Sequence, residues 1–234
     1  MTAGAGPADL APALAFGPDA ALPAGYARLA AGARLQRGHT PGRAPGFFGP
    51  PVGQPGRNRF DVTGPRAADA PGVCYLALTT AGVLLERVLR DARLPVLSRA
   101  RLDRAHAWTE ATLARPLVLL DLWLAPGVHG VQVADISAPP QLDSAAGADP
   151  LGIPYPRTQR LADAWAARNA AADFPTPGGR VHGVLYGSRF GPASLCVALW
   201  ELTADVLVWG STRPLGQAPG LAEAANRIGV GLVA

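Results

Sequence analysis

The apolar residues of this chain fall into short runs, and the spacing of these runs says more about the fold than any other feature. Three strand-like runs follow one another closely at 181–186, 194–202 and 206–209, separated by turns that contain Gly, Pro or Asp. Helical patterns occur elsewhere, but they do not alternate regularly with the strands. This arrangement predicts an α+β fold with a mixed, mainly antiparallel sheet and flanking helices, and it argues against a doubly wound parallel sheet.

Other elements are predicted from periodicity and from capping residues. A buried strand is expected at 72–78, and Thr79 or Thr80 can cap a helix that runs to about Asp91. Ser98 is a plausible cap for a helix through about Ala114, which would end before Pro116. The remaining predictions are a strand at 117–124, helices at 157–171 and 221–227, a final strand at 229–233, and loops at 41–56 and 138–156.

Length and hydropathy predict one domain. The chain has 234 residues, of which 49% are hydrophobic, enough for one substantial core. Residues 1–30 are rich in Ala, Pro and Gly and are expected to form an extended or partly helical arm on a domain at 31–234. No apolar run approaches the ~20 residues that span a bilayer. The N-terminus does not resemble a secretion signal, so a cytoplasmic protein without membrane contact is expected.

Charge and cysteine content narrow the possible functions. The net charge of +4 comes from arginine alone, because the chain contains no lysine. Base composition in a GC-rich genome explains that preference, and the arginines are spread along the chain, whereas nucleic-acid binders more often cluster them. Cys74 and Cys196 lie in apolar runs and are predicted to be reduced core thiols. The four histidines lack metal-ligand spacing, so no metal site is expected.

Three charged residues stand in distinctive contexts. Arg37 and Arg59 can supply planar donor forks that suit a diphosphate, although any single arginine is more often a solvated surface residue. Glu86 follows an apolar run on a predicted helix, where burial of a carboxylate costs several kcal/mol unless a cation or a ligand partners it. An ordinary helical ion pair with Arg90, four residues on, is the alternative for Glu86.

Two uncharged polar residues complete the candidate set. Tyr75 lies on the predicted strand at 72–78, either as a core aromatic or as a ring that stacks on a base or a nicotinamide. Ser188 follows the strand at 181–186, where its hydroxyl could face an open sheet end or simply form a turn. Of the four histidines, His39 alone is expected near the proposed site, and a plain loop role is favoured for it. Gly-x-Ser-x-Gly, Walker and Gly-x-Gly-x-x-Gly motifs do not occur.

The order of these contexts resembles a known family. The stretch NRFDVTGPRAADAPGVCYLALTTAGVLLERVLRD and the later stretch HGVLYGSRFGPASLCVALWE look like characteristic segments of the RES domain, a bacterial family named for its Arg, Glu and Ser residues. The segment PLVLLDL at 116–122 resembles a further strand of that family. The resemblance runs from about Arg34 to Val233, so it covers nearly the whole predicted domain.

The resemblance implies an α+β core related to ADP-ribosyltransferase toxins, with NAD as substrate. Many members of the family are toxins that degrade NAD by phosphorolysis to nicotinamide and ADP-ribose phosphate, and others are linked to ADP-ribosylation of a protein. It therefore implies no resident cofactor, inorganic phosphate as co-substrate, and an Xre-like helix-turn-helix antitoxin as partner in a hetero-oligomer. A mono-ADP-ribosyltransferase and a non-catalytic basic nucleic-acid-binding module are the alternatives, although direct DNA contact is not expected.

The resemblance also assigns roles to residues. It places the functional arginines of the family on Arg37 and Arg59, its tyrosine on Tyr75, its acid on Glu86 and its serine on Ser188. Glu86 would stabilise positive charge on the ribose, the arginines would hold phosphate groups, and Tyr75 and Ser188 would contact the nicotinamide end. The family often has an aromatic residue before the first arginine, where this chain has Gln36. Arg34 is therefore an alternative to Arg37 as the first arginine. For the second arginine, Arg57 is an alternative to Arg59.

Overall fold

The computed structural model describes residues 22–46, 58–62, 72–89, 95–130, 155–171, 180–188, 191–200 and 205–234. Most of the predicted arm and of the two predicted loops lies outside these residues. The described end of the arm includes a strand, β1 (Tyr26–Leu29), which pairs with β6 (Leu117–Asp121) in the main sheet. Residues 26–29 are therefore part of the sheet itself.

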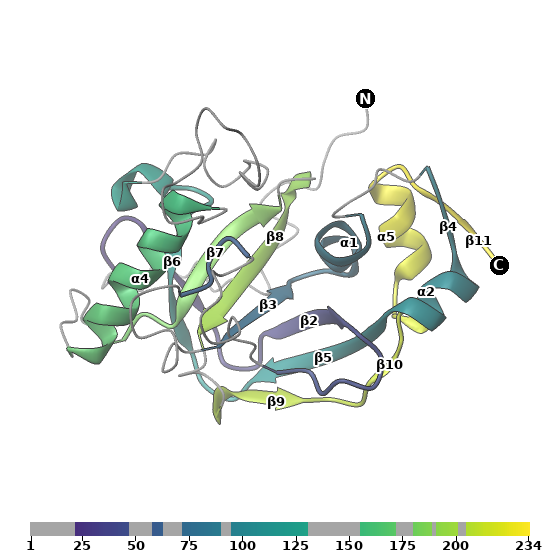
Figure 1. Ribbon diagram of the computed structural model, residues 1–234, viewed down its shortest axis with the longest axis horizontal. Helices are drawn as coiled ribbons and strands as arrows, with labels where there is room; N and C mark the ends of the chain where they lie inside the picture. Colours follow the sequence, from purple (N-terminus) through teal and green to yellow (C-terminus); the bar gives the residue numbers. More distant parts are fainter. Residues whose placement is uncertain are drawn as a thin grey trace.

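The main sheet has nine strands in the order β1-β6-β7-β8-β3-β2-β5-β10, with β9 also paired to β5 (Figure 1). All of its described pairings are antiparallel except β6 with β7. The predicted α+β fold with a mixed, mainly antiparallel sheet is thus confirmed. The further strands of this sheet are β2 (Arg34–His39), β3 (Val73–Ala77), β5 (Ala107–Leu113), β7 (Gly183–Ser188), β8 (Gly191–Trp200), β9 (Leu207–Trp209) and β10 (Arg213–Pro214).

Four α-helices and a short parallel sheet complete the described fold. Helix α1 (Thr80–Val83) continues directly into a π-helix, η2 (Leu84–Val88). Helices α1, α2 (Arg99–Ala105) and α5 (Leu221–Arg227) lie together near one end of the main sheet, while α4 (Pro156–Ala170) lies near the other (Figure 1). The small sheet pairs β4 (Val96–Ser98) with β11 (Gly231–Val233), and 3-10 turns occur at Pro126–His129 and Leu215–Gln217.

Two hydrophobic clusters occupy the two faces of the main sheet. Because successive strand residues point to opposite faces, β3 sends Val73 and Ala77 into the cluster that includes helix residues, and Cys74 and Leu76 into the other. The second cluster draws its apolar residues from strands β1, β2, β3, β5, β6, β7, β8 and β9, together with neighbouring loop residues. The curled sheet therefore packs against itself on one face and against helices on the other.

The sheet is nearly divided between β2 and β3. These strands share only the Gln36–Ala77 register pair, whereas β2 pairs with β5 over six residues and β3 with β8 over five. We call this weak junction the seam. Without a continuous hydrogen-bonded ladder the two strands can separate, and the space between them is where polar side chains of both can meet.

Several predicted elements are confirmed, and one is wrong. The strands at 72–78 and 117–124 and the helices at 157–171 and 221–227 match β3, β6, α4 and α5 to within a few residues. Of the helix predicted from Ser98 to Ala114, only α2 forms, capped by Ser98 as expected. Residues 107–113 instead form β5, because pairing with β2 and β9 and burial of its alternate residues outweigh the local helical pattern.

Two further expectations can be compared with the described residues. Cys74 and Cys196 are buried free thiols, as predicted. Of the helices that the structure describes, none combines the length and the apolar character needed to cross a membrane.

Gly183 provides a test of how tightly β7 packs on β8. A Cβ atom at this position would lie 2.1 Å from the Ala198 carbonyl oxygen and 2.9 Å from Leu199 Cα, both backbone atoms. We expect Gly183→Ala to lower the free energy of unfolding by about 3 kcal/mol, because the strands would have to move apart. Urea denaturation followed by circular dichroism measures this loss. Gly127→Ala, whose Cβ would meet nothing within 4 Å, is the control; equal midpoints for the two variants would contradict the packing.

Candidate active site

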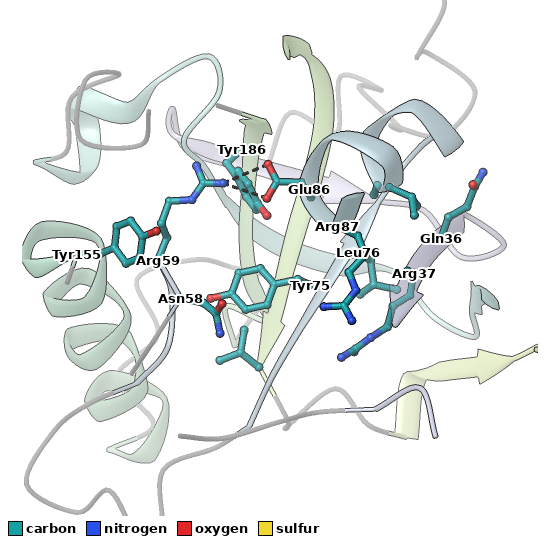
Figure 2. Close-up of a pocket in the computed structure, with 14 residues that line it drawn as sticks. Gln36, Arg37, Asn58, Arg59, Tyr75, Leu76, Glu86, Arg87, Tyr155 and Tyr186 are labelled. Atoms are coloured by element: carbon teal, nitrogen blue, oxygen red, sulfur yellow. Dashed lines mark hydrogen bonds and ion pairs between the residues drawn. The ribbon is translucent and has the colours of Figure 1, made fainter. Parts of the chain in front are cut away.

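A cavity of about 210 Å³ opens at the seam. Strands β2 and β3, the end of α1, η2, the segment 58–59, the start of α4 and strand β7 all contribute to its wall. Figure 2 shows its polar side chains converging from these elements. The lining residues are Gln36, Arg37, Gly38, Asn58, Arg59, Val73, Tyr75, Leu76, Ala77, Val83, Glu86, Arg87, Tyr155 and Tyr186.

An ion pair between Arg59 and Glu86 forms one end of the cavity. Arg59 Nη2 donates to both carboxylate oxygens of Glu86, at 3.2 Å to Oε1 and 3.1 Å to Oε2 (Figure 2). The Arg59 side chain is only 7% exposed, whereas the Glu86 side chain is 22% exposed. The buried arginine thus compensates a carboxylate that still reaches the cavity. This pairing accounts for the acid on an apolar helix; Arg90, its alternative partner, lies outside the described residues.

Glu86 owes its position to the way α1 begins and ends. Thr79, one of the two predicted caps, accepts a hydrogen bond from the Gly82 N–H through its hydroxyl (3.2 Å) and starts the helix above β3. The turn then widens, because the Leu89 N–H donates to the Leu84 carbonyl five residues earlier (2.9 Å). Such π-turns often occur at functional sites. Here the π-turn presents both Glu86 and Arg87 to the cavity.

Arg59 is held by a short segment that is fastened at both ends. The Asp61 carboxylate accepts from the Asn58 backbone N–H (2.9 Å) and from Asn58 Nδ2 (3.0 Å), which closes a tight turn around Arg59. Gln159 of α4 donates through Nε2 to the Asn58 carbonyl (2.9 Å). The turn and the helix together fix the direction of the Arg59 side chain.

Aromatic rings surround the ion pair. The Arg59 guanidinium lies 4.9 Å from the centre of the Tyr186 ring, and the Phe60 ring packs against the same tyrosine at 4.9 Å. Burial by itself would lower the pKa of Arg59, but attraction by Tyr186 and Glu86 raises it above its ordinary value. Arg59 therefore remains charged and keeps its ion pair with Glu86.

The Tyr75 side chain links strand β3 to the short segment 58–62 that carries Arg59. Its hydroxyl donates to Asp61 Oδ1 (3.1 Å) and accepts from the Phe60 backbone N–H (2.9 Å). Burial foremost, and then the nearby Asp61 and Tyr186, raise the pKa of Tyr75 well above 10, so the phenol stays protonated and remains a donor. The ring itself lies in the middle of the cavity (Figure 2).

Arg37 lies at the end of the cavity away from the ion pair (Figure 2). Its guanidinium donates to the Gly46 carbonyl and to Cys74 Sγ. Arg34, the alternative first arginine, is 76% exposed, lies 3.8 Å from Glu110 and does not line the cavity. Arg57, the alternative second arginine, is outside the described residues. Burial raises the pKa of Cys74 to about 11 although Arg37 opposes that shift, so this thiol stays protonated.

Ser188 and His39 stand apart from the other candidates. Ser188 is buried at the end of β7, beside an irregularity in the pairing with β8, and it is not among the described cavity-lining residues. It lies two residues after Tyr186, which does line the cavity. His39 ends β2, where its Nε2 lies 2.9 Å from Thr109 Oγ1, and it does not line the cavity either.

Several cavity residues were not singled out from the sequence. Tyr186 was visible only as part of a strand motif, and Tyr155, Asn58 and Arg87 were not among the candidate site residues. Gln36, noted as a departure from the family pattern, has a clear structural role. Its Oε1 accepts from Thr80 Oγ1 (2.8 Å) and Trp108 Nε1 (3.1 Å), and these bonds tie β2 to α1 and β5.

The Tyr75 hydroxyl gives a test of this network. We expect Tyr75→Phe to lower the free energy of unfolding by about 1–3 kcal/mol, because the Phe60 N–H loses its acceptor in a partly buried position. Tyr155→Phe is the matched control, since the hydrogen bonds described for Tyr155 involve only its backbone carbonyl. Chemical denaturation of both variants measures the difference, and an equal loss in both would contradict a structural role for the Tyr75 hydroxyl.

Comparison with known proteins gives one clear result. No curated protein sequence matches the chain, and no solved structure matches it either. The family model described as the RES domain matches residues 32–215, which include β2, the cavity-lining segments and β10. The chain therefore belongs to the RES domain family.

Proposed function

We propose that this protein is an NAD-consuming enzyme that breaks the bond between nicotinamide and ribose. The observation that carries the proposal is the Arg59–Glu86 pair: a carboxylate that reaches a cavity, held in place by a buried arginine and surrounded by tyrosines. Membership of the RES family supports an NAD-related activity. The charge and shape of the cavity support the same chemistry.

Glu86 is suited to the charge that develops in this reaction. When the C1′–N bond breaks, its electron pair passes to the nicotinamide nitrogen, which becomes neutral, and positive charge develops on the ribose ring. A fixed carboxylate beside the ribose stabilises this oxocarbenium character, as in glycoside cleavage. Glu86 would act in this way without forming a covalent bond. Arg59 would be a positioning residue that keeps the carboxylate oriented.

The other lining residues suit the rest of the dinucleotide. The Tyr75 ring lies in the middle of the cavity and is partly exposed, so it offers an aromatic face to the nicotinamide ring. Arg37 at the opposite end is suited to phosphate oxygens through its planar guanidinium. A nicotinamide ribose near Glu86 and a diphosphate near Arg37 would therefore place the substrate along the seam. Ser188, behind Tyr186, would support the nicotinamide end.

Inorganic phosphate is the proposed nucleophile. Its oxygen would form the new bond to C1′, which yields nicotinamide and ADP-ribose phosphate. Phosphate is already an anion, so it needs no general base to remove a proton, whereas hydrolysis requires an activated water. The described cavity lining contains no histidine to serve as such a base. The arginines would also draw a dianion into the site.

An enzyme that consumes NAD without control would harm its own cell, so we propose that it acts as a toxin with a protein inhibitor. An Xre-like helix-turn-helix antitoxin that covers the cavity mouth is the expected partner, as the family resemblance implies. Loss of NAD turnover when the purified candidate antitoxin is added would support this pairing. An antitoxin that binds without any effect on turnover would contradict inhibition by coverage of the cavity.

The role of Glu86 can be tested by a substitution that preserves shape. We expect Glu86→Gln to reduce the release of nicotinamide from NAD by about 100-fold to 1,000-fold, because the amide cannot stabilise a developing cation. Glu223→Gln is the matched control, since Glu223 is 75% exposed and pairs with Arg227 on the surface. Liquid chromatography of nicotinamide measures both variants. Undiminished turnover by the Glu86 variant would remove this residue from the reaction.

The nucleophile can be identified from the products. We expect the rate of nicotinamide release to rise with phosphate concentration until it saturates, and the ribosyl product to carry one additional phosphate. Mass spectrometry of the product checks this directly. Turnover that is independent of phosphate and gives plain ADP-ribose would contradict phosphorolysis, and so would transfer of labelled ADP-ribose to a protein acceptor.

A further inference from the structure

We propose that Arg87 is a second phosphate-binding residue and that, together with Arg37, it forms a site for the diphosphate of a nucleotide. This inference rests on the proposed function for the identity of the substrate. It assigns a role to Arg87, which is not among the residues to which the family resemblance gives a function. It also separates the arginines into two groups, with Arg59 serving Glu86 and the other two serving the substrate.

Arg87 and Arg37 approach the same part of the cavity from different elements. Arg87 comes from η2 and Arg37 from β2, and both line the cavity. Figure 2 shows both side chains extending toward the end that lies away from the Arg59–Glu86 pair. Both also help to lower the pKa of His39, after the larger effect of burial. Two permanent positive charges therefore converge at one end of the seam.

Gly38 makes this approach possible. A Cβ atom at position 38 would lie 2.8 Å from Val83 Cγ1 and 3.0 Å from Arg87 Cγ. The absence of a side chain on β2 thus lets η2 lie directly against the strand, with the aliphatic part of Arg87 passing over Gly38. Any larger residue would push Arg87 away from the cavity.

Thr40 helps to orient Arg87. Arg87 Nη2 donates to Thr40 Oγ1 at 2.9 Å, just beyond the end of β2. This bond from a neutral hydroxyl helps to fix the direction of the guanidinium. Arg87 is also exposed, so it is accessible to a ligand that enters from solvent.

Charge favours a diphosphate as the ligand at this end. Two guanidinium groups near each other repel, and an anion that contacts both relieves that repulsion. Each planar fork can hold phosphate oxygens through paired hydrogen bonds. A diphosphate carries two negative charges and so matches two arginines that extend toward the same end of the cavity. Arg59 is a poorer partner, because an anion there would compete with Glu86.

The first experiment compares substrates with and without phosphate. We expect Arg87→Gln to raise the KM for NAD at least tenfold while kcat stays within about twofold, because the lost contact is remote from the scissile bond. Nicotinamide riboside, which has the same bond but no phosphate, should be cleaved equally by wild type and variant. An unchanged KM for NAD, or an equal defect with the riboside, would overturn the assignment.

The second experiment does not depend on catalysis. ADP-ribose contains the diphosphate but not the scissile bond, and we expect calorimetry to show at least tenfold weaker binding to Arg87→Gln than to wild type. Arg104→Gln, an exposed arginine on α2 outside the cavity, is the control and should bind as wild type does. Equal ADP-ribose affinity in wild type and the folded Arg87 variant would overturn the inference. A wild type that binds ADP-ribose through Arg87 but leaves NAD intact would overturn the proposed function alone.

Discussion

The Arg59–Glu86 ion pair is the interaction on which the architecture of the cavity depends. It joins a turn closed by Asp61 to the π-helix η2, which continues from the Thr79-capped helix α1, and Arg59 lies over the Tyr186 ring. Arg59 is buried, so loss of Glu86 would remove an anionic partner from a buried charge at a cost of several kcal/mol. The same pairing keeps the carboxylate directed at the cavity. Both the stability of this region and the chemistry proposed for it therefore depend on the Arg59–Glu86 ion pair.

The seam gives this ion pair its setting. A sheet with a continuous ladder between β2 and β3 would have closed the space that Arg37, Tyr75 and Glu86 share. The single Gln36–Ala77 register pair leaves it open, while the bonds from Thr80 and Trp108 to Gln36 keep β2 attached to the rest of the fold. The site is thus a local interruption of regular structure that neighbouring side chains stabilise.

The sequence predicted the fold class and most of the long elements, because strand and helix periodicity is local. It failed at 107–113, where the partners that make β5 a strand are 34–39 and 207–209, far away in the chain. The same limit applies to the site. Glu86 was conspicuous as an acid after an apolar run, but its partner Arg59 is 27 residues away, and no spacing rule links them. Tyr186, Tyr155 and Arg87 became recognisable only once the strands and helices had brought them together.

The central claim is that Glu86 stabilises positive charge on the ribose of NAD. The most direct measurement is the secondary kinetic isotope effect on nicotinamide release from NAD that carries deuterium at C1′ of the nicotinamide ribose. If C1′ acquires oxocarbenium character while Glu86 faces it, the labelled substrate reacts more slowly, and the rate ratio lies clearly above one. A ratio of one, under conditions where bond cleavage limits the rate, would mean that no such cation develops and would contradict the role assigned to Glu86.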